Sequence, residues 1–264
     1  LASDWCSTTT SSGVHTLLRA QICSPPSAVH VTTGNTLQLS SATGDGSVGI
    51  ISGQSRTSGS HLFFVTGSLS ITDLILENSQ STGVGGAMFV HEASASVHLI
   101  RTTVRNCKAV TKGGGIYMQN SARLTLEDST FYSNTANYGG AIASTFGATI
   151  TLQAGSTVRL YENVANKQGG GVYLANTGSA LSIVGVGTKL VVERNFASVY
   201  GGGIGVEASA KLTISGGGNL TTIGNSATVL GGGWFLGDGS SVEINGPSTA
   251  ILKANSAGTG GGNL

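Results

Sequence analysis

Short stretches in which apolar and polar residues alternate recur along most of the chain. In the clearest of them two aliphatic residues flank one polar residue, as in Leu212-Thr213-Ile214. A period of two is typical of β-strands, whose successive side chains point to opposite faces, and not of helices. One series of such pairs is Leu69/Ile71, Val97/Leu99, Leu124/Leu126, Ile150/Leu152, Leu181/Ile183, Leu212/Ile214 and Val242/Ile244. A second series precedes it at Met88/Val90, Ile116/Met118, Val172/Leu174, Ile204/Val206 and Trp234/Leu236, and a third, as at 74–76 and 131–132, follows it. The pattern predicts three short strands in each repeat.

Two landmarks divide these strands into repeats of about 30 residues. A run of glycines followed by an apolar residue precedes the first strand, as in Gly139-Gly140-Ala141-Ile142. An asparagine follows the third strand, in the series Asn78, Asn106, Asn134, Asn163, Asn195, Asn225 and Asn255, with steps of 28, 28, 29, 32, 30 and 30 residues. Glycine permits a positive φ or a close approach of two backbones, and stacked asparagine amides can donate and accept along a ladder. We therefore expect glycines at one corner of each repeat and an asparagine ladder at the opposite corner.

A repeat of this length cannot bury its apolar face alone, but stacked repeats enclose a continuous core between parallel sheets. The sequence therefore predicts an all-β, single-stranded parallel β-helix of about eight three-strand rungs over residues 28–264. Residues 1–27 are expected to form an N-terminal cap, because Val14, Leu17, Leu18 and Ile22 follow the spacing of a short amphipathic helix. At the other end the chain reaches Leu264 directly after a glycine run. We expect either further rungs beyond it or docking of the open end on another subunit.

One repeat carries a recognisable pair of motifs. Phe131-Tyr132-Ser133-Asn134 and Gly139-Gly140-Ala141-Ile142 resemble the FxxN and GGA(I/L/V) repeats of the chlamydial polymorphic membrane proteins. The resemblance covers residues 62–262 through its repetition, with Ile, Thr, Leu or Val at the Phe position of the other repeats. It implies a right-handed, pectate-lyase-like β-helix exposed outside the cell, which in that family is an adhesive passenger segment.

Composition narrows the classes of protein to which the chain can belong. Glycine accounts for 42 of 264 residues and charged residues for 9%, which disfavours a helical protein, while 39% hydrophobic residues disfavour disorder. The net charge of +1, without clustered Lys or Arg, argues against nucleic acid as a partner. No apolar run reaches the roughly 18 residues that span a bilayer. We therefore expect no nucleic-acid partner and no membrane span in this segment.

Stacking turns equivalent positions of successive rungs into columns on the surface. Between the two inward residues of the first strand lie Phe89, Tyr117, Ala143, Tyr173, Gly205 and Phe235. We predict that the four rings, Phe89, Tyr117, Tyr173 and Phe235, face outward and form a candidate binding column for sugar rings or a partner protein. The alternative is that the rings lean along the sheet and cover backbone.

Three further surface features each have two interpretations. The residues before the asparagines include Glu77 and Arg105, which fit an acid/base pair with a substrate clamp or, as we prefer, a ladder of opposite charges. Outward Ser and Thr on the second strand suggest an ice-binding face or an ordinary sheet surface. Glycine-rich additions at 154–156, 185–187, 216–218 and 245–247 lengthen the last rungs along one edge, and they either bind a partner or are tolerated insertions.

The residues that catalysis or metal binding would require are scattered. A lyase would need clustered carboxylates for calcium and a basic residue, and a hydrolase would need paired carboxylates on neighbouring rungs. Glu127-Asp128 is the one adjacent carboxylate pair, and the five His, all within the first 100 residues, lack metal-ligand spacing. The glycine runs lack the Lys-Ser/Thr and the helix of a phosphate-binding loop. We predict no catalytic residue, no metal site and no cofactor.

The three cysteines bear on the cellular compartment. Cys6 and Cys23 flank the predicted cap and can close an 18-residue disulfide loop, which would suit an oxidising, extracellular setting. Cys107 is the odd one and is expected to be a small buried residue.

Together these observations predict a non-enzymatic, extracellular or cell-surface β-solenoid with a structural or adhesive role. Its partners would be surface glycans or other protein subunits, including copies of itself joined end-on or laterally. The alternative is a polysaccharide-binding or polysaccharide-degrading β-helix protein, which would need a groove lined by carboxylates beside the aromatic column. Ice binding is a third alternative.

Overall fold

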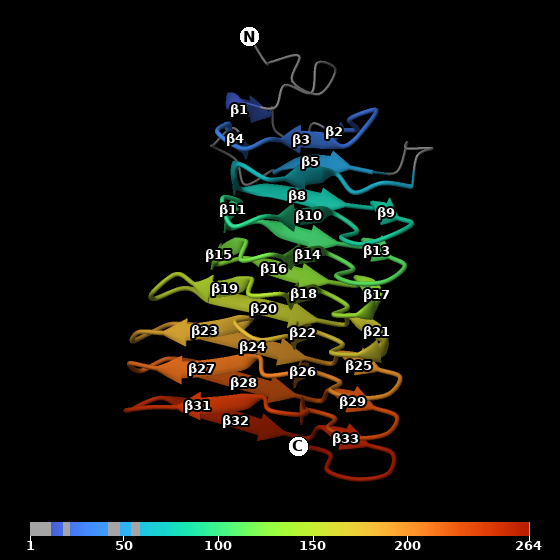
Figure 1. Cartoon of the computed structure of the whole chain (residues 1–264), viewed down its shortest axis with the longest axis vertical. Helices are drawn as coiled ribbons and strands as arrows, with labels where there is room; N and C mark the ends of the chain where they lie inside the picture. The colour runs from blue at the N-terminus through green and yellow to red at the C-terminus, as the bar shows by residue number, and fades with distance from the viewer. Residues whose placement is uncertain (1–11, 18–21, 42–47, 54–58, 264) are drawn as a thin grey trace.

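The chain winds into a solenoid whose turns stack along one axis from the N-terminal to the C-terminal end (Figure 1). The computed structural model describes residues 12–17, 22–41, 48–53 and 59–263. Within these residues every regular element is a β-strand, and all pairings between strands are parallel. One of the parallel sheets has eight strands, one for each turn. The predicted all-β parallel β-helix of about eight rungs is confirmed.

From residue 63 onward, each turn passes through four parallel sheets in the order C, A, B, D. Sheet C contains β3 (Val29–Val31), β6 (Phe63–Val65), β10 (Met88–His91), β14 (Ile116–Gln119), β18 (Ile142–Thr145), β22 (Val172–Ala175), β26 (Ile204–Glu207) and β30 (Trp234–Leu236). Sheet A contains β1 (Gly13–Leu17), β4 (Thr36–Ser41), β7 (Ser68–Thr72), β11 (Ser96–Ile100), β15 (Arg123–Glu127), β19 (Thr149–Leu152), β23 (Ala180–Val184), β27 (Lys211–Ser215) and β31 (Ser241–Ile244).

The other two sheets complete the turn. Sheet B contains β2 (Ile22–Cys23), β5 (Gly49–Ser52), β8 (Leu74–Glu77), β12 (Thr103–Arg105), β16 (Thr130–Tyr132), β20 (Thr157–Tyr161), β24 (Lys189–Glu193), β28 (Asn219–Ile223) and β32 (Thr249–Lys253). Sheet D contains β9 (Gln80–Ser81), β13 (Lys108–Ala109), β17 (Thr135–Tyr138), β21 (Val164–Gln168), β25 (Phe196–Ala197), β29 (Ser226–Ala227) and β33 (Ser256–Ala257).

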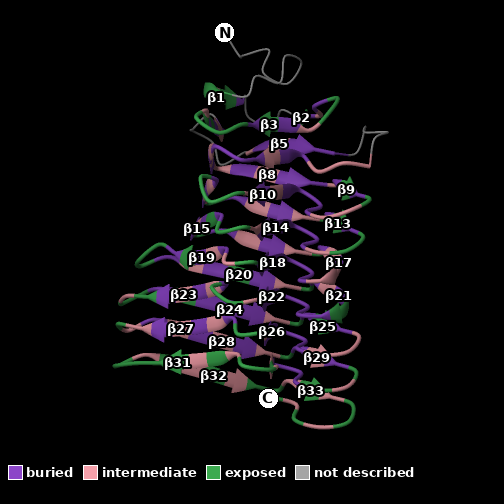
Figure 2. Cartoon of the chain, in the orientation of Figure 1, coloured by how far each residue is buried: buried purple, intermediate pink, exposed green. Residues whose placement is uncertain are grey.

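Equivalent residues of successive turns lie directly over one another. Val97 of β11 pairs with Leu69 of β7 on one side and with Leu124 of β15 on the other. All three are buried, and such inward columns from the sheets form the core of the tube. In Figure 2 the strands of the middle turns are largely coloured as buried, whereas β31 in the last turn is not. A fully buried aliphatic side chain contributes roughly 1.5–3 kcal/mol, so the filled tube compensates for the low strand propensity of a glycine-rich sequence.

The fourth strand of each turn differs from the three predicted. Sheet D follows the asparagine corner, and several of its strands have only two residues, such as Lys108–Ala109. A strand this short shows no period of two, which is why the alternation does not reveal it. Its inward residue is a small one, as with the buried Ala136 and Ala165. A small residue leaves room for the asparagine side chains beside it.

The predicted N-terminal helix is not what the described residues of that segment form. Gly13–Leu17 is strand β1, which pairs with β4, and Ile22–Cys23 is strand β2, which pairs with β5. Val14 and Ile22, two of the residues with helical spacing, are 73% and 65% exposed. The upper edges of sheets A and B offer unpaired backbone groups, and pairing with them outweighs a helix of two turns, which is marginal in isolation. Residues 1–11 and 18–21 of the predicted cap lie outside the described residues.

The glycine corner between sheets D and C needs glycine for two separate reasons. Gly169 has a φ of +68°, a backbone conformation that L-residues rarely adopt. A Cβ on Gly170 would lie 2.2 Å from the carbonyl oxygen of Gly202, the equivalent glycine of the next turn. Successive turns therefore touch backbone to backbone at this corner.

Candidate functional site

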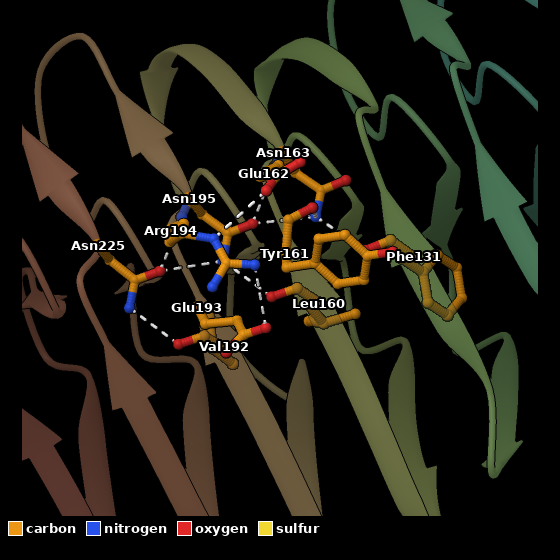
Figure 3. A network of polar contacts seen from close by, with 10 residues as sticks. All are labelled: Phe131, Leu160, Tyr161, Glu162, Asn163, Val192, Glu193, Arg194, Asn195 and Asn225. Carbon is orange, nitrogen blue, oxygen red and sulfur yellow. Dashed lines mark hydrogen bonds and ion pairs between the residues drawn. The ribbon is translucent and has the colours of Figure 1, made fainter.

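A row of asparagine side chains fixes the corner between sheets B and D. The Nδ2 of Asn163 donates to Oδ1 of Asn195 at 2.9 Å, and the backbone N–H of Asn163 donates to the same oxygen at 3.0 Å (Figure 3). The Nδ2 also donates to the backbone oxygen of Phe131, in the preceding turn, at 3.1 Å. Asn134, Asn195 and Asn225 repeat the same contacts. Each side chain therefore ties three successive turns together, as expected of an asparagine ladder.

Asn78 and Asn106 lie outside this row, which corrects the predicted series. They hold left-handed φ values of 54° and 53° at the corner itself. The register of sheet D gives the ladder position of those turns to Ser79 and Cys107. The row begins where the backbone N–H of Cys107 donates to Oδ1 of Asn134 at 3.0 Å. It continues to Asn255, whose Nδ2 donates to Oδ1 of Asn263 at 3.1 Å.

The outward face of sheet B carries a continuous row of charged and aromatic side chains, here called the sheet B strip. Its members are Glu77, Arg105, Tyr132, Tyr161 and Glu193, each in register with the next. Arg105 donates from Nε to Glu77 at 2.8 Å and from Nη1 to the hydroxyl of Tyr132 at 2.8 Å. The rings of Tyr132 and Tyr161 stack with centroids 4.9 Å apart and planes 7° apart.

Arg194 closes the strip at the end shown in Figure 3. Its guanidinium lies 5.9 Å from the centre of the Tyr161 ring and forms ion pairs of 3.3 Å with Glu162 and Glu193. Because Arg105 lies over the far side of Tyr132, both faces of both rings are covered. A sugar ring therefore cannot stack on them, and the strip acts to brace successive turns.

The sheet B strip contains residues that the sequence interpretation missed. That interpretation took the residue before each asparagine, which places Ser133 and Glu162 in the column of Glu77 and Arg105. This choice is one position out of register, and it leaves out Tyr132 and Tyr161. The available signal was the recurrence of tyrosine two residues before Asn134 and two residues before Asn163. The preferred interpretation as a ladder of opposite charges agrees with the observed pairing of Glu77 with Arg105.

The predicted aromatic column exists on the outward face of sheet C, but much of it is covered. The register stacks Phe89, Tyr117, Ala143, Tyr173, Gly205 and Phe235 over one another. Tyr117 and Tyr173 are only 4% and 5% exposed, which corrects their expected exposure, while Phe89 and Phe235 are half-buried. The rings therefore form a second apolar cluster outside the tube.

Side chains from the end of sheet D cover this column. Tyr138 packs against Tyr173 with ring centroids 5.0 Å apart, and Tyr200 stacks on Phe235 at 4.5 Å. Lys112 lies 5.7 Å from the centre of the Tyr117 ring, and burial lowers its pKa. Burial likewise raises the pKa of Tyr117. Tyr117 and Tyr173 are therefore buried members of a side-chain cluster, and not an exposed binding surface.

A hollow of about 390 Å³ opens on the outward face of sheet A, here called the sheet A hollow. Four consecutive strands of the sheet contribute to it. Its lining is Thr36 and Gln38 of β4, Ser68, Leu69 and Ser70 of β7, Ser96, Val97 and His98 of β11, and Thr125 of β15. The lining has no Lys, Arg, Asp or Glu side chain. Hydroxyl, amide and imidazole groups therefore determine what the hollow can bind.

One carboxylate stands beside the hollow. The Nε2 of His98 lies 3.7 Å from Oε2 of Glu127 and has no hydrogen-bond partner in the described part of the chain. At the adjoining corner Arg101 donates from Nε and Nη2 to the two carboxylate oxygens of Asp73 at 2.7 and 2.8 Å. This hydrogen bonding holds the pKa of Asp73 below its usual range. The carboxylates of Glu127 and Asp73 thus lie beside sheet A, whereas the carboxylate of Glu207 accepts a hydrogen bond from the hydroxyl of Tyr173 in the aromatic column on sheet C.

The glycine-rich additions form a row of stacked turns that projects beside β19, β23, β27 and β31, here called the ledge (Figure 1). Hydroxyl groups order it from turn to turn. The Oγ1 of Thr188 accepts from the backbone N–H of Gly155 at 2.9 Å and donates to the oxygen of Val184 at 2.9 Å. Val186 at the tip is 82% exposed. The ledge is therefore a regular surface with an apolar tip.

The described residues also bear on three further kinds of feature: a metal site, a membrane-spanning helix and a disulfide bond. Within residues 12–17, 22–41, 48–53 and 59–263, no three His, Cys, Asp or Glu side chains are arranged to hold a metal ion. The same residues contain no helix long and apolar enough to cross a membrane. Cys23 is buried and disulfide-bonded, whereas its predicted partner Cys6 lies outside the described residues. Cys107 is a free, buried thiol.

Comparison with known proteins gives one match. The family model described as a right-handed β-helix region matches residues 27–248. No curated protein and no solved structure matches the chain.

Proposed function

Because the chain belongs to the family of right-handed β-helix proteins, we propose that it is a non-enzymatic, extracellular β-solenoid with a structural or adhesive role. The observation that carries this proposal is the use of outward side chains as ties between turns. Glu77, Arg105, Tyr132 and Tyr161 pair along the axis, as do Lys211 and Glu243 at 2.6 Å. Such ties make a rigid rod with long, regular faces, which suits display and contact at a surface.

Two observations support the extracellular setting. Cys23 is disulfide-bonded, and disulfides persist in oxidising compartments. The resemblance of Phe131–Asn134 and Gly139–Ile142 to the repeats of chlamydial polymorphic membrane proteins favours exposure at a cell surface. In this proposal the partners are surface glycans or other subunits, met end-on or laterally.

The covered rings shift the expected contacts away from sheet C. Tyr117 and Tyr173 are buried, so the sheet A face and the ledge are the better candidates for adhesive contact. On the ledge, the exposed Val186 and the half-exposed Val184 provide apolar surface.

Solution mass, electron microscopy and surface binding test this proposal. We expect purified protein to form filaments or lateral assemblies, or to adhere to glycan-coated surfaces and to cells. A monomer that forms no assembly and adheres to none of these surfaces would overturn it.

The second candidate function is action on a polysaccharide, and the His98–Glu127 pair beside the sheet A hollow favours it. An imidazole and a carboxylate 3.7 Å apart can exchange a proton with a bound substrate. Activity on a panel of acidic and neutral polysaccharides, lost in Glu127→Ala, would favour this function. Arg105→Ala is the matched control, because Arg105 pairs with Glu77 and Tyr132 on another face.

A further inference from the structure

We propose that Asn245 is a site of spontaneous deamidation, at which the protein acquires a carboxylate on an otherwise uncharged ledge. The turns of the ledge, at 154–156, 185–187, 216–218 and 245–247, contain no Asp, Glu, Lys or Arg. Asn245-Gly246 is the one Asn-Gly pair of the sequence, and both residues are exposed at the tip of the fourth turn. Asparagine is a labile residue, and a following glycine leaves the peptide nitrogen unhindered because it has no Cβ.

The two groups that must react are free, while the backbone around them is held. Among the residues described, neither the side-chain amide of Asn245 nor the backbone N–H of Gly246 has a hydrogen-bond partner. The backbone N–H of Asn245 donates to the oxygen of Ile214 at 2.9 Å, and Oγ of Ser248 donates to the oxygen of Asn245 at 2.8 Å. A Cβ on Gly246 would meet no atom within 4 Å. The reacting groups therefore have room to approach each other without breaking a contact.

A second exposed asparagine with a small residue after it differs in this respect. Asn120 and Ser121 are both exposed at the corner between sheets C and A. The Nδ2 of Asn120 forms a hydrogen bond of 2.8 Å with Nε2 of His91, and the backbone N–H of Ser121 donates to the oxygen of Phe146 at 3.0 Å. Both bonds must break before the same reaction can occur there. Exposure alone therefore does not select Asn245; its unbonded amide and unbonded neighbouring N–H do.

The reaction consumes one water molecule and releases one ammonia. Base removes the proton of the Gly246 peptide nitrogen, which attacks Cγ of Asn245. The bond from Cγ to the side-chain nitrogen breaks, ammonia leaves with the proton, and a five-membered succinimide remains. Water then opens this ring at one of its two carbonyls. Attack at Cγ gives aspartate, and attack at the backbone carbonyl gives isoaspartate.

Either product changes the surface of the ledge. The new carboxylate lowers the formal net charge by one from +1. It lies two residues after Glu243, whose own carboxylate is already paired with Lys211 at 2.6 Å. In isoaspartate the side-chain methylene enters the main chain between Ile244 and Gly246, beside the contact with Ile214. The reaction needs only this turn and water, so it is independent of the proposed function.

The test is peptide mapping by mass spectrometry of purified protein kept in neutral buffer at physiological temperature. We expect the peptide that contains Asn245 to gain the mass that corresponds to OH in place of NH₂, and electron-transfer fragmentation to show both aspartate and isoaspartate. Conversion at Asn245 should be about tenfold or more faster than at Asn120, where two hydrogen bonds must break first. It should also accelerate as pH rises, because the attacking nitrogen must lose its proton.

Two glycine variants separate the chemistry from a general disturbance of the ledge. In Gly246→Ala we expect conversion of Asn245 to slow about tenfold or more, because the new Cβ hinders the attacking nitrogen. Gly155→Ala is the matched control, since Gly155 is also a ledge glycine with a left-handed φ and no atom within 4 Å of its Cβ position. There the rate at Asn245 should not change.

Asn245→Gln gives a check that leaves both glycines in place. It keeps a side-chain amide but requires a six-membered ring, so the mass gain at this position should disappear. The inference is overturned if Asn245 gains no mass while Asn120 does, if the two convert at equal rates, or if Gly246→Ala reacts as fast as Gly155→Ala. Absence of any mass gain along the whole chain would overturn it as well.

Discussion

At the scale of single residues, two neighbouring positions at each asparagine corner favour the same amino acid for different reasons. The corner position has a left-handed φ, which asparagine tolerates better than most residues, and the next position needs an amide that can stack. Asn106 meets the first need and Asn134 the second. The sequence therefore predicts the ladder correctly from Asn134 onward, but it cannot distinguish the two positions at Asn78 and Asn106.

Removal of one ladder amide should be costly. We expect Asn163→Ala to lower the free energy of unfolding by about 2–4 kcal/mol, because it leaves the buried backbone N–H of Asn134 and one hydrogen of the Asn134 Nδ2 without their acceptor. Urea unfolding followed by circular dichroism measures the loss. Asn166→Ala is the control, since Asn166 is exposed and makes one contact of 3.2 Å with Asn137. Similar losses in both variants would contradict the role given to the ladder.

The thiol of Cys107 should make stability depend on alkaline pH. Burial raises its pKa from its ordinary value of 9.0 to about 12. The folded state therefore holds the proton more tightly than the unfolded chain. The resulting stability is fully present below about pH 9 and is lost as pH rises through 12, at up to about 1.4 kcal/mol per pH unit.

Cys107→Ala isolates this contribution. Between pH 9 and 11 we expect the unfolding free energy of the variant to fall less steeply than that of the wild type, whatever the offset between them. Parallel curves would show that the thiol does not gain a proton on folding. Thiol-specific alkylation of the native protein at pH 8 should be slow for the same reason.

At the scale of elements, strands with a regular alternation were predictable and strands without it were not. The paired aliphatics of Val97/Leu99 and Met88/Val90 identify sheets A and C from sequence alone. Sheet D escapes because a two-residue strand carries no period. The outward direction of Tyr173 was also predictable, but its burial was not, because Tyr138 reaches it only once the glycine corner folds sheet D against sheet C.

The glycine corner offers a test at this scale. In Gly170→Ala the new Cβ would lie 2.2 Å from the oxygen of Gly202 and 2.5 Å from that of Phe196, so adjacent turns must separate. We expect a loss of about 3 kcal/mol or more. Gly155→Ala on the ledge meets no atom within 4 Å and bears only the strain of its φ of +81°, about 1–2 kcal/mol. Melting temperatures of the two variants measure the difference. A lower melting temperature for Gly155→Ala than for Gly170→Ala would refute this account.

At the scale of the whole molecule, the faces of the rod arise from side-chain sizes summed over several turns. The sheet A hollow exists where Ser68, Ser70 and Ser96 lie between longer neighbours in adjacent strands. No single repeat contains that information, so the hollow could not be predicted from sequence although each outward column could. The stacking of Tyr132 on Tyr161 in the sheet B strip could not be predicted either. It depends on the register between turns, which the one left-handed residue at each corner after sheet B helps to set.

Stability should vary along the axis. Inward residues of the middle turns, such as Leu152 and Leu190, are buried, whereas in the last described turn Ile244 is 47% exposed and Ala250, in the column of Leu190, is only partly buried. In this 264-residue chain we expect amides of β31 and β32 to exchange with deuterium at least tenfold faster than those of β19 and β24. Mass spectrometry of exchanged peptides measures this, and uniform protection along the rod would contradict it.

The asparagine row also has a sense of direction. Each side-chain oxygen accepts only from the turn before it, and each amino group gives one hydrogen to the turn after it. A bare peptide N–H, that of Cys107, is enough to start the row, whereas its final member needs an acceptor, here Asn263. Translation also proceeds from the N-terminal turn to the C-terminal turn. Each newly synthesised turn therefore supplies the asparagine Oδ1 that accepts from the asparagine of the preceding turn. The row can therefore be extended toward the C-terminus one turn at a time.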